Sequence, residues 1–279
     1  MNKIIGLISA WGAEKWVKLS IQQAINICDK VLINVGPYVE NVKKFEDKTR
    51  EICESFGNKI IIVNSLTANS HANAKAKTLN SMLAKSTIFE VGNWIWLFDV
   101  DEFYNESLVD NMKSQLFSGN YNALKMDEMY FFINMQHYLK NTRMRLWKIE
   151  NINHSFIPTN KWTGPRNKKL YYPEFKYFHY STLMNQRLKK EVYKTEQGSL
   201  NKDQREKMEW VDKIYMKYDL SNEEPWIKLN HKLYGKKQPY WISDFKPDEN
   251  GKLFIYNEKH PKLIEDSGLT KIEDFRLCY

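Results

Sequence analysis

The sequence predicts an α/β fold with a mostly parallel sheet that is covered by helices on both faces. Apolar strand-like runs alternate with amphipathic helical segments through the first half of the chain, and the connections between them are short. The runs are apolar at nearly every position, as is typical of parallel strands buried on both faces. With 279 residues, the chain is long enough to bury a sizeable core.

The first half supplies the alternating elements. Strands are expected at Ile4–Ser9, Val31–Val35, Lys59–Val63 and Trp94–Phe98. Helices are expected where apolar residues recur near helical spacing, at Glu14–Cys28, Val39–Phe56 and Ala72–Ala84. Because ligands gather at the carboxyl ends of parallel strands, the residues that follow each strand are candidates for a site.

The second half has a different texture, with proline-containing loops between its strands. Strands are expected at Tyr121–Phe132, Met144–Ile149 and Tyr171–Ser181. Helical patterns follow at Gln186–Lys194 and Lys202–Tyr218, and then an irregular tail rich in Trp, Pro and Lys. We expect one α/β domain over residues 1–183. A helical and irregular C-terminal region, residues 184–279, is expected to pack on it.

Charge and composition narrow the class of protein. The net charge of +8 permits a polyanionic partner but selects none. No stretch approaches the ~20 apolar residues of a membrane span, so none is predicted. The 3 cysteines lack the spacing of a metal site and form an odd number, which suits a reducing compartment, so we expect a cytoplasmic protein. No feature of the sequence indicates the oligomeric state.

A pair of carboxylates follows the fourth expected strand directly. Asp99 and Asp101, with Glu102 next to them, can present oxygen ligands of the kind that Mg²⁺ or Mn²⁺ prefers. A cation held there stabilises a leaving diphosphate as a Lewis acid. An isolated pair of this spacing is common, and these acids could instead cap a helix that begins with Glu102. The strand–helix alternation before the pair favours a metal–diphosphate site, with both carboxylates exposed by the turn.

With these residues in place, the chain from residue 1 to about 182 resembles nucleotide-sugar glycosyltransferases of the GT-A fold. It is similar to the large inverting family that contains many polysaccharide enzymes. The segments that carry the resemblance are Ile4–Ala10 with Glu14, Asp29–Asn34, Ala76–Ala84, Trp94–Phe103, Arg143–Trp147 and Phe178–Tyr180. The chain departs from the family at Lys77-Thr78, where Arg-Asn is usual, and at Asn34, where an acidic residue is common.

The resemblance implies a metal-dependent hexosyltransferase with a nucleoside-diphosphate sugar, UDP-linked, as donor. It implies a donor half over residues 1–103 and an acceptor half over residues 104–183. The metal ligands would be Asp99, Asp101 and His179. Donor contacts are expected from Ala10, Trp11, Glu14, Asn34, Lys75, Lys77, Asp99, Lys189 and Lys190.

An inverting transfer also needs a carboxylate that deprotonates the acceptor hydroxyl. Asp127 and Glu128 are adjacent on an expected strand, so their side chains point to opposite faces and only one can reach the cleft. We favour Glu128 as the catalytic base. The alternative is that one of the two pairs with Arg143 or Arg145 on a neighbouring strand, and a retaining reaction also stays open.

The acceptor is less constrained than the donor. A glycan or another hydroxyl acceptor is the first hypothesis. A hydroxylated DNA base is the second, because the basic and aromatic second half suits a phosphate backbone and an extruded base. A non-catalytic nucleic-acid-binding protein is a third, although no nucleic-acid-binding motif is visible. Nucleotidyl transfer is disfavoured because no glycine-rich phosphate loop follows the first strand.

Overall fold

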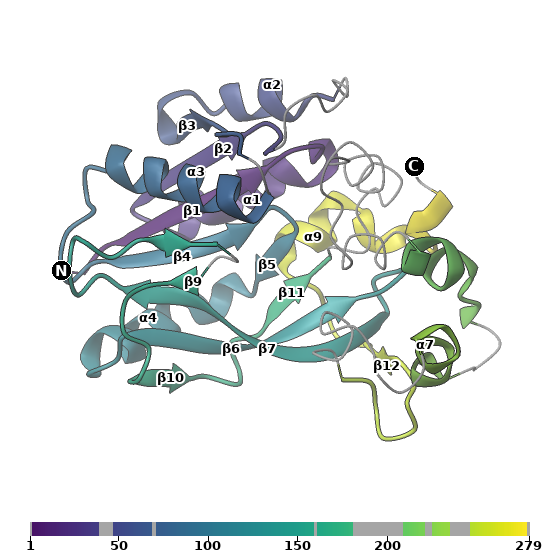
Figure 1. Ribbon diagram of the computed structural model, residues 1–279. Helices are drawn as coiled ribbons and strands as arrows, with labels where there is room; N and C mark the ends of the chain where they lie inside the picture. The colour runs from purple at the N-terminus through teal and green to yellow at the C-terminus, as the bar shows by residue number, and fades with distance from the viewer. Residues whose placement is uncertain are drawn as a thin grey trace. The chain divides into compact units, whose positions relative to one another are not determined.

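The computed structural model describes residues 2–38, 47–68, 71–158, 161–180, 209–220, 225–234 and 246–277. Ten of the described strands form one sheet in the order β3-β2-β1-β4-β7-β6-β11-β5, with β10 paired to β6 and β12 to β7 (Figure 1). The strands β8 and β9 pair separately with each other. The chain divides into two compact units. Unit 1 comprises Met1–Asp127 and Thr142–Tyr177, and unit 2 comprises Glu128–Asn141 and Phe178–Tyr279. The boundary predicted after residue 183 falls outside the described residues and stays a prediction.

Unit 1 begins with the parallel strands that the sequence predicts. They are β1 (Ile4–Ala10), β2 (Lys30–Val35), β3 (Ile61–Asn64) and β4 (Trp94–Asp99). The pairs β3–β2, β2–β1 and β1–β4 are all parallel, whereas β4 pairs antiparallel with β7 (His137–Lys148). The prediction of an α/β fold with a mostly parallel first half is therefore confirmed.

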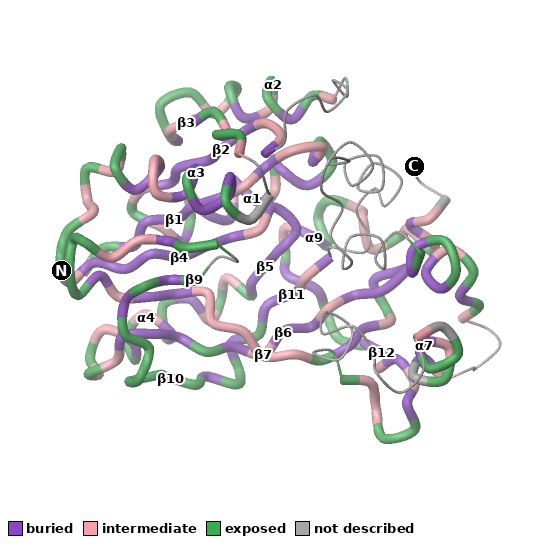
Figure 2. The backbone as a smooth tube through the Cα atoms, viewed as in Figure 1, coloured by how far each residue is buried: buried purple, intermediate pink, exposed green. Residues whose placement is uncertain are grey.

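One face of this sheet is covered by α3 (His71–Lys85). Its Leu79, Met82 and Leu83 belong to the same buried cluster as Leu7 of β1 and Leu97 of β4. Alternate residues of each strand project to this face, and Figure 2 shows both strands buried along their length. Because these side chains interlock, Leu97→Ala is expected to cost about 2–5 kcal/mol of stability.

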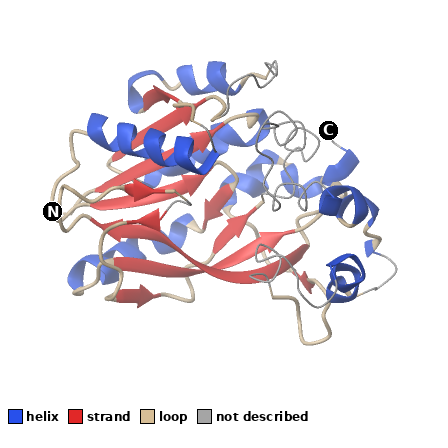
Figure 3. Ribbon diagram, in the orientation of Figure 1, coloured by secondary structure: helices blue, strands red, loops and turns tan. Residues whose placement is uncertain are grey.

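The opposite face carries aromatic side chains of β4 and is covered by α1 (Glu14–Ile27) and α4 (Val109–Ser118). Trp94 contacts Phe117 of α4, and the ring of Trp96 stacks on Phe98 with centroids 4.9 Å apart. A Cβ at Gly6 would approach the Sγ of Cys28 to 2.9 Å, so a glycine lets the chain pack closely here. Helices thus lie on both faces, as predicted (Figure 3).

The remaining short elements belong to one unit or the other. In unit 1 they are α2 (Thr49–Glu54), η1 (Gly57–Lys59), β5 (Glu102–Tyr104), η2 (Glu106–Leu108), β8 (Phe156–Ile157), β9 (Lys161–Trp162) and β10 (Lys169–Tyr171). The strands β6 (Ala123–Phe131), β7 and β11 (Tyr177–His179) continue from one unit into the other. In unit 2 they are η4 (Tyr215–Lys217), α7 (Trp226–Tyr234), β12 (Phe254–Ile255), α9 (Lys262–Ser267), η6 (Leu269–Lys271) and η7 (Phe275–Leu277).

Unit 2 has its own aromatic core around Phe132, at the turn between β6 and β7. The rings of Trp210, Tyr215, Tyr218 and Trp226 all contact it, with the ring of Trp226 nearest at 4.5 Å between centroids. The irregular C-terminal sequence is therefore rich in aromatics because they form this core. Among the described residues, no helix has the length and apolarity needed to cross a membrane.

Some predicted elements have different bounds. The described part of the helix predicted at Val39–Phe56 is helical only over Thr49–Glu54, because the Asp47 carboxylate accepts a hydrogen bond from the Thr49 N–H and precedes the first turn. The strand predicted at Tyr171–Ser181 is wrong as one element: a turn at Pro173, closed by Phe175 N–H and Tyr172 O, separates β10 from β11.

Candidate functional site

The acidic turn after β4 is largely buried. The Asp99 side chain is 26% exposed and that of Glu102 is fully buried, while Asp101 as a whole residue is 5% exposed. The Asp99 N–H donates to Glu102 Oε2 at 3.2 Å, which closes the turn. The expectation that the turn exposes both aspartates is therefore wrong for Asp101. Glu102 begins β5 rather than a helix, so the helix-cap alternative fails as well.

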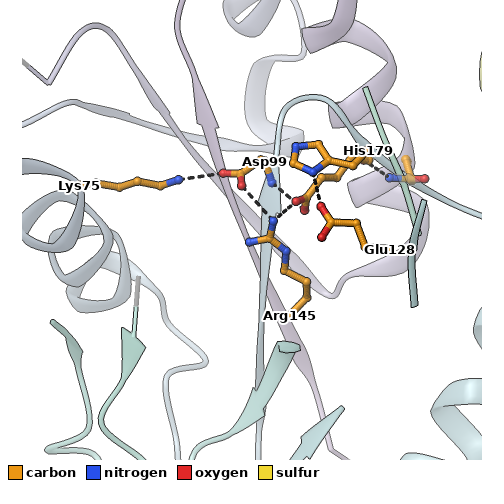
Figure 4. Close-up of polar contacts among 7 residues, drawn as sticks. Lys75, Asp99, Glu128, Arg145 and His179 are labelled. Atoms are coloured by element: carbon orange, nitrogen blue, oxygen red, sulfur yellow. Dashed lines mark hydrogen bonds and ion pairs between the residues drawn. The ribbon is translucent and has the colours of Figure 1, made fainter. Parts of the chain in front are cut away.

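Two cations hold the Asp99 carboxylate from different elements (Figure 4). Lys75 Nζ of α3 lies 2.8 Å from Oδ1, and Arg145 Nη2 of β7 lies 3.1 Å from Oδ2. The Lys75 and Arg145 side chains are each 11% exposed. Arg145 also forms an ion pair with Glu102 and lies over the ring of Tyr177. Each oxygen of Asp99 therefore has a cationic partner.

The carboxylates keep both cations charged. Burial alone lowers the pKa of Lys75, but the charges of Asp99 and Tyr38 and the hydrogen bond to Asp99 together outweigh it, so the pKa of Lys75 is raised. Burial likewise opposes the charge of Arg145, while Tyr177 and Asp99 favour it, and the net effect raises the pKa of Arg145. Because Asp101 and Glu102 add two more carboxylates, the cluster has one formal negative charge in excess.

A divalent metal is suited to part of this donor set. The carboxylates of Asp99 and Asp101 are the oxygen ligands that Mg²⁺ and Mn²⁺ prefer. Over the ranges that the structure describes, no three or more His, Cys, Asp and Glu residues are grouped so as to hold a metal ion. A metal ion at Asp99 would also compete with Lys75 and Arg145 for its oxygens. Asp99 and Asp101 are therefore chemically suitable metal ligands. To bind a metal ion, Asp99 would have to give up a contact with Lys75 or Arg145.

The carboxyl ends of three neighbouring strands meet at this cluster. Asp99 of β4 is in register with Ser9 of β1, and Ser9 is in register with Asn34 of β2. Ala10, the last residue of β1, is buried, and Trp11 follows it half-buried. The structure thus brings together the ends that the sequence analysis assigned to donor binding.

Asn34 and Glu14 have partners inside the protein. The Asn34 amide accepts from Tyr38 Oη at 3.0 Å and donates to Ser65 Oγ at 2.9 Å. Glu14, exposed in the first turn of α1, accepts from the Lys48 N–H at 3.3 Å. Asn34 is fully buried, so both ends of its amide serve to join β2 to the segments beside it.

The two lysines of α3 point to different places. Lys75 reaches Asp99, whereas Lys77, two positions on, is exposed on another face of the helix. That face borders a groove of about 320 Å³, lined by Ala68, Asn73, Ala76, Lys77, Asn80, Phe156, Ile157 and Pro158. Of the two, Lys75 is the one that the structure brings to the acidic turn.

In unit 2, Glu128 and His179 form a close pair, drawn in Figure 4. The Glu128 side chain is 1% exposed, and its Oε1 lies 2.5 Å from His179 Nδ1. The ring of Tyr130 contacts the imidazole edge-on at 4.9 Å between centroids. A carboxylate at one ring nitrogen is the kind of partner that orients a metal-ligating histidine. The same carboxylate could also act as a proton acceptor.

Asp127 is placed differently from Glu128, as expected for adjacent residues of a strand. In unit 1, its Oδ1 accepts from Tyr171 Oη at 2.9 Å on the exposed side of β6. Lys189 and Lys190 lie outside the described residues, so their predicted contact with the diphosphate stays a prediction.

Arg145 is the site residue that sequence reasoning assigned least well. The sequence places it only in a segment that carries the resemblance and as an alternative partner for Asp127 or Glu128. A guanidinium that is buried inside a sheet requires an anionic partner. The sequence shows an arginine within a strand, but neither the burial of its guanidinium nor the carboxylate that it meets.

No protein-family model matches the sequence, and no curated protein is significantly similar to it. The chain is similar in fold to crystal structures of S. aureus TarS. For TarS 1–349 the identity is 11% and the TM-score 0.44, over 81% of this chain and 78% of that one. For a longer TarS structure the same values are 11% and 0.44, over 82% of this chain but only 48% of that one. For TarS 1–349 in complex with UDP-GlcNAc they are 10% and 0.42.

Proposed function

We propose that this chain is a glycosyltransferase that transfers a sugar from a nucleoside-diphosphate donor, UDP-linked, to a hydroxyl acceptor. One observation carries the proposal. The carboxylates of Asp99, Asp101 and Glu102 follow a buried parallel strand, and Lys75 and Arg145 are ion-paired among them. Carboxylates for a divalent cation and fixed cations at the end of a parallel sheet are what a leaving diphosphate requires.

The cations and carboxylates have distinct proposed roles. Lys75 supplies a point charge for the diphosphate, and Arg145 keeps the acidic turn in place through Asp99 and Glu102. Asp99 and Asp101 would hold a divalent metal, with His179 as the further ligand that the family resemblance implies. When bound, such a metal acts as a Lewis acid on the diphosphate.

For the acceptor side, Glu128 is the proposed general base of an inverting reaction. Its carboxylate takes the proton of the acceptor hydroxyl as the oxygen attacks the sugar, and its hydrogen bond to His179 orients it. Asp127 is less suited to this role, because its carboxylate accepts a hydrogen bond from Tyr171 at an exposed position.

The experiment is a panel of UDP-, GDP- and dTDP-sugars with Mn²⁺ or EDTA, scored by thermal shift and by release of the nucleotide. We expect UDP-sugars to stabilise the protein in the presence of metal. Asp101→Asn should abolish the metal-dependent response, whereas Asp110→Asn, at an exposed position of α4, should keep it. The proposal fails when no sugar nucleotide binds, or when Asp101→Asn retains full activity.

A glycan is the first proposed acceptor, and one surface of unit 1 favours DNA as the second. Tyr171 is 50% exposed on β10, and Lys125 Nζ lies 5.7 Å from the centre of its ring. Exposed Arg166, Lys168 and Lys169 precede it in the chain. Cations beside an exposed ring suit phosphates and a stacked base. Binding of an oligonucleotide that weakens steeply with salt would support DNA, and indifference to salt would exclude it.

A further inference from the structure

Asp99 is the counter-ion of two buried cations. Lys75 and Arg145 each bond to a different oxygen of its carboxylate, at 2.8 and 3.1 Å. Charges removed from water are stable only when they are paired, so this carboxylate keeps Lys75 and Arg145 charged and in place. A ligand that is itself an anion must compete with Asp99 for the same donors.

We infer that Asp99 is an internal competitor of the donor's diphosphate, which displaces the carboxylate from Lys75 on binding. This inference rests on the proposed function. Carboxylate and phosphate oxygens accept the same charge-assisted hydrogen bonds from lysine and arginine. The Asp99 carboxylate thus keeps Lys75 in position, and the diphosphate of the donor takes its place at the Lys75 ammonium group.

The two cations differ in how easily they can exchange partners. Arg145 also pairs with the fully buried Glu102. Its guanidinium therefore stays in position when its ion pair with Asp99 is broken. Lys75 carries a flexible stem and a point charge, and its partner Asp99 is the most exposed carboxylate of the cluster. The exchange therefore takes place at Lys75, while Arg145 keeps the turn in position.

The test is calorimetric binding of inorganic pyrophosphate and of UDP at low salt in EDTA. Asp99→Asn removes the competing charge, so both ligands should bind about tenfold more tightly than to the wild type. Asp110→Asn removes the same charge from an exposed position of α4 and should change the affinity less than twofold. If Asp99 served only as a metal ligand, its substitution would leave binding in EDTA unchanged, and that result overturns the inference.

A second variant keeps the test decisive should Asp99→Asn not fold. Lys75→Met should weaken pyrophosphate binding in EDTA at least fivefold, and the double variant with Asp99→Asn should lose the tenfold gain. Unchanged binding by Lys75→Met overturns the inference. A wild-type protein that binds neither UDP nor any sugar nucleotide, with or without metal, overturns the proposed function instead. Binding by the wild type without a gain in Asp99→Asn overturns the inference alone.

Discussion

Two buried polar clusters of this protein differ in charge: one is made of ion pairs and the other of neutral hydrogen-bonded groups. In unit 1, Asp99, Lys75 and Arg145 form a charged cluster whose central carboxylate is partly exposed. In unit 2, His260 accepts from Tyr180 Oη at 2.8 Å through Nδ1 and donates to Met135 O at 2.9 Å through Nε2. The second cluster is neutral, because burial lowers the pKa of His260 and raises that of Tyr180.

The difference distinguishes a candidate binding site, the charged cluster around Asp99, from the cluster around His260, which serves only to stabilise unit 2. Both ring nitrogens of His260 are used inside unit 2, so the cluster joins the C-terminal segment to the turn after β6 and offers nothing to a ligand. The charged cluster of unit 1 costs desolvation, and a hydrophobic replacement would stabilise the fold as well. A cluster of buried charges with this desolvation cost, at the ends of parallel strands, indicates a function in binding or chemistry.

The largest expected effect comes from breaking the charged cluster. Arg145→Met leaves Glu102 buried without its cationic partner, so we expect a loss of about 3–5 kcal/mol of unfolding free energy. Arg145→Lys keeps the positive charge but lacks the planar guanidinium that donates to two carboxylates at once, so it should recover only part of the loss. Urea denaturation measures both variants. A loss below 1 kcal/mol for Arg145→Met would show that the cluster does not stabilise unit 1.

The next effect concerns Glu128. As the proposed base it cannot be replaced by an amide, so Glu128→Gln should lower kcat at least about 100-fold with little change in KM for the donor. Steady-state kinetics measures this split, with Asp127→Asn as the matched control at the adjacent position. Full activity of Glu128→Gln combined with inactivity of Glu128→Ala would instead assign the carboxylate to holding His179.

The sequence predicts the parallel strands and the acidic turn after β4 better than the rest of the molecule, for a physical reason. The strands around β4 are apolar runs whose ends are marked by Asp99 and Asp101, so local pattern and chain order are enough. The partners Lys75 and Arg145 come from α3 and β7, and which carboxylate they meet depends on packing that no local pattern encodes. The core around Phe132 is equally non-local, since its aromatics are spread over an irregular tail.

The smallest expected effect lies in the neutral cluster and depends on pH. The folded pKa of His260 is below its ordinary value of 6.5, mainly through burial, with the hydrogen bond to Met135 O and the charge of Glu265 opposing the shift. Between these two pKa values the unfolded chain binds more protons than the folded one, so the stabilisation present above pH 6.5 is lost as the pH falls. Burial also lowers the pKa of His137, so the wild type alone cannot isolate the effect.

His260→Gln keeps a donor and an acceptor without the titration, and its melting temperature should fall less than that of the wild type between pH 7 and 5. Equal slopes would mean that the pKa of His260 is the same in the folded and the unfolded chain, and the contrast between a charged cluster and a neutral one would then fail.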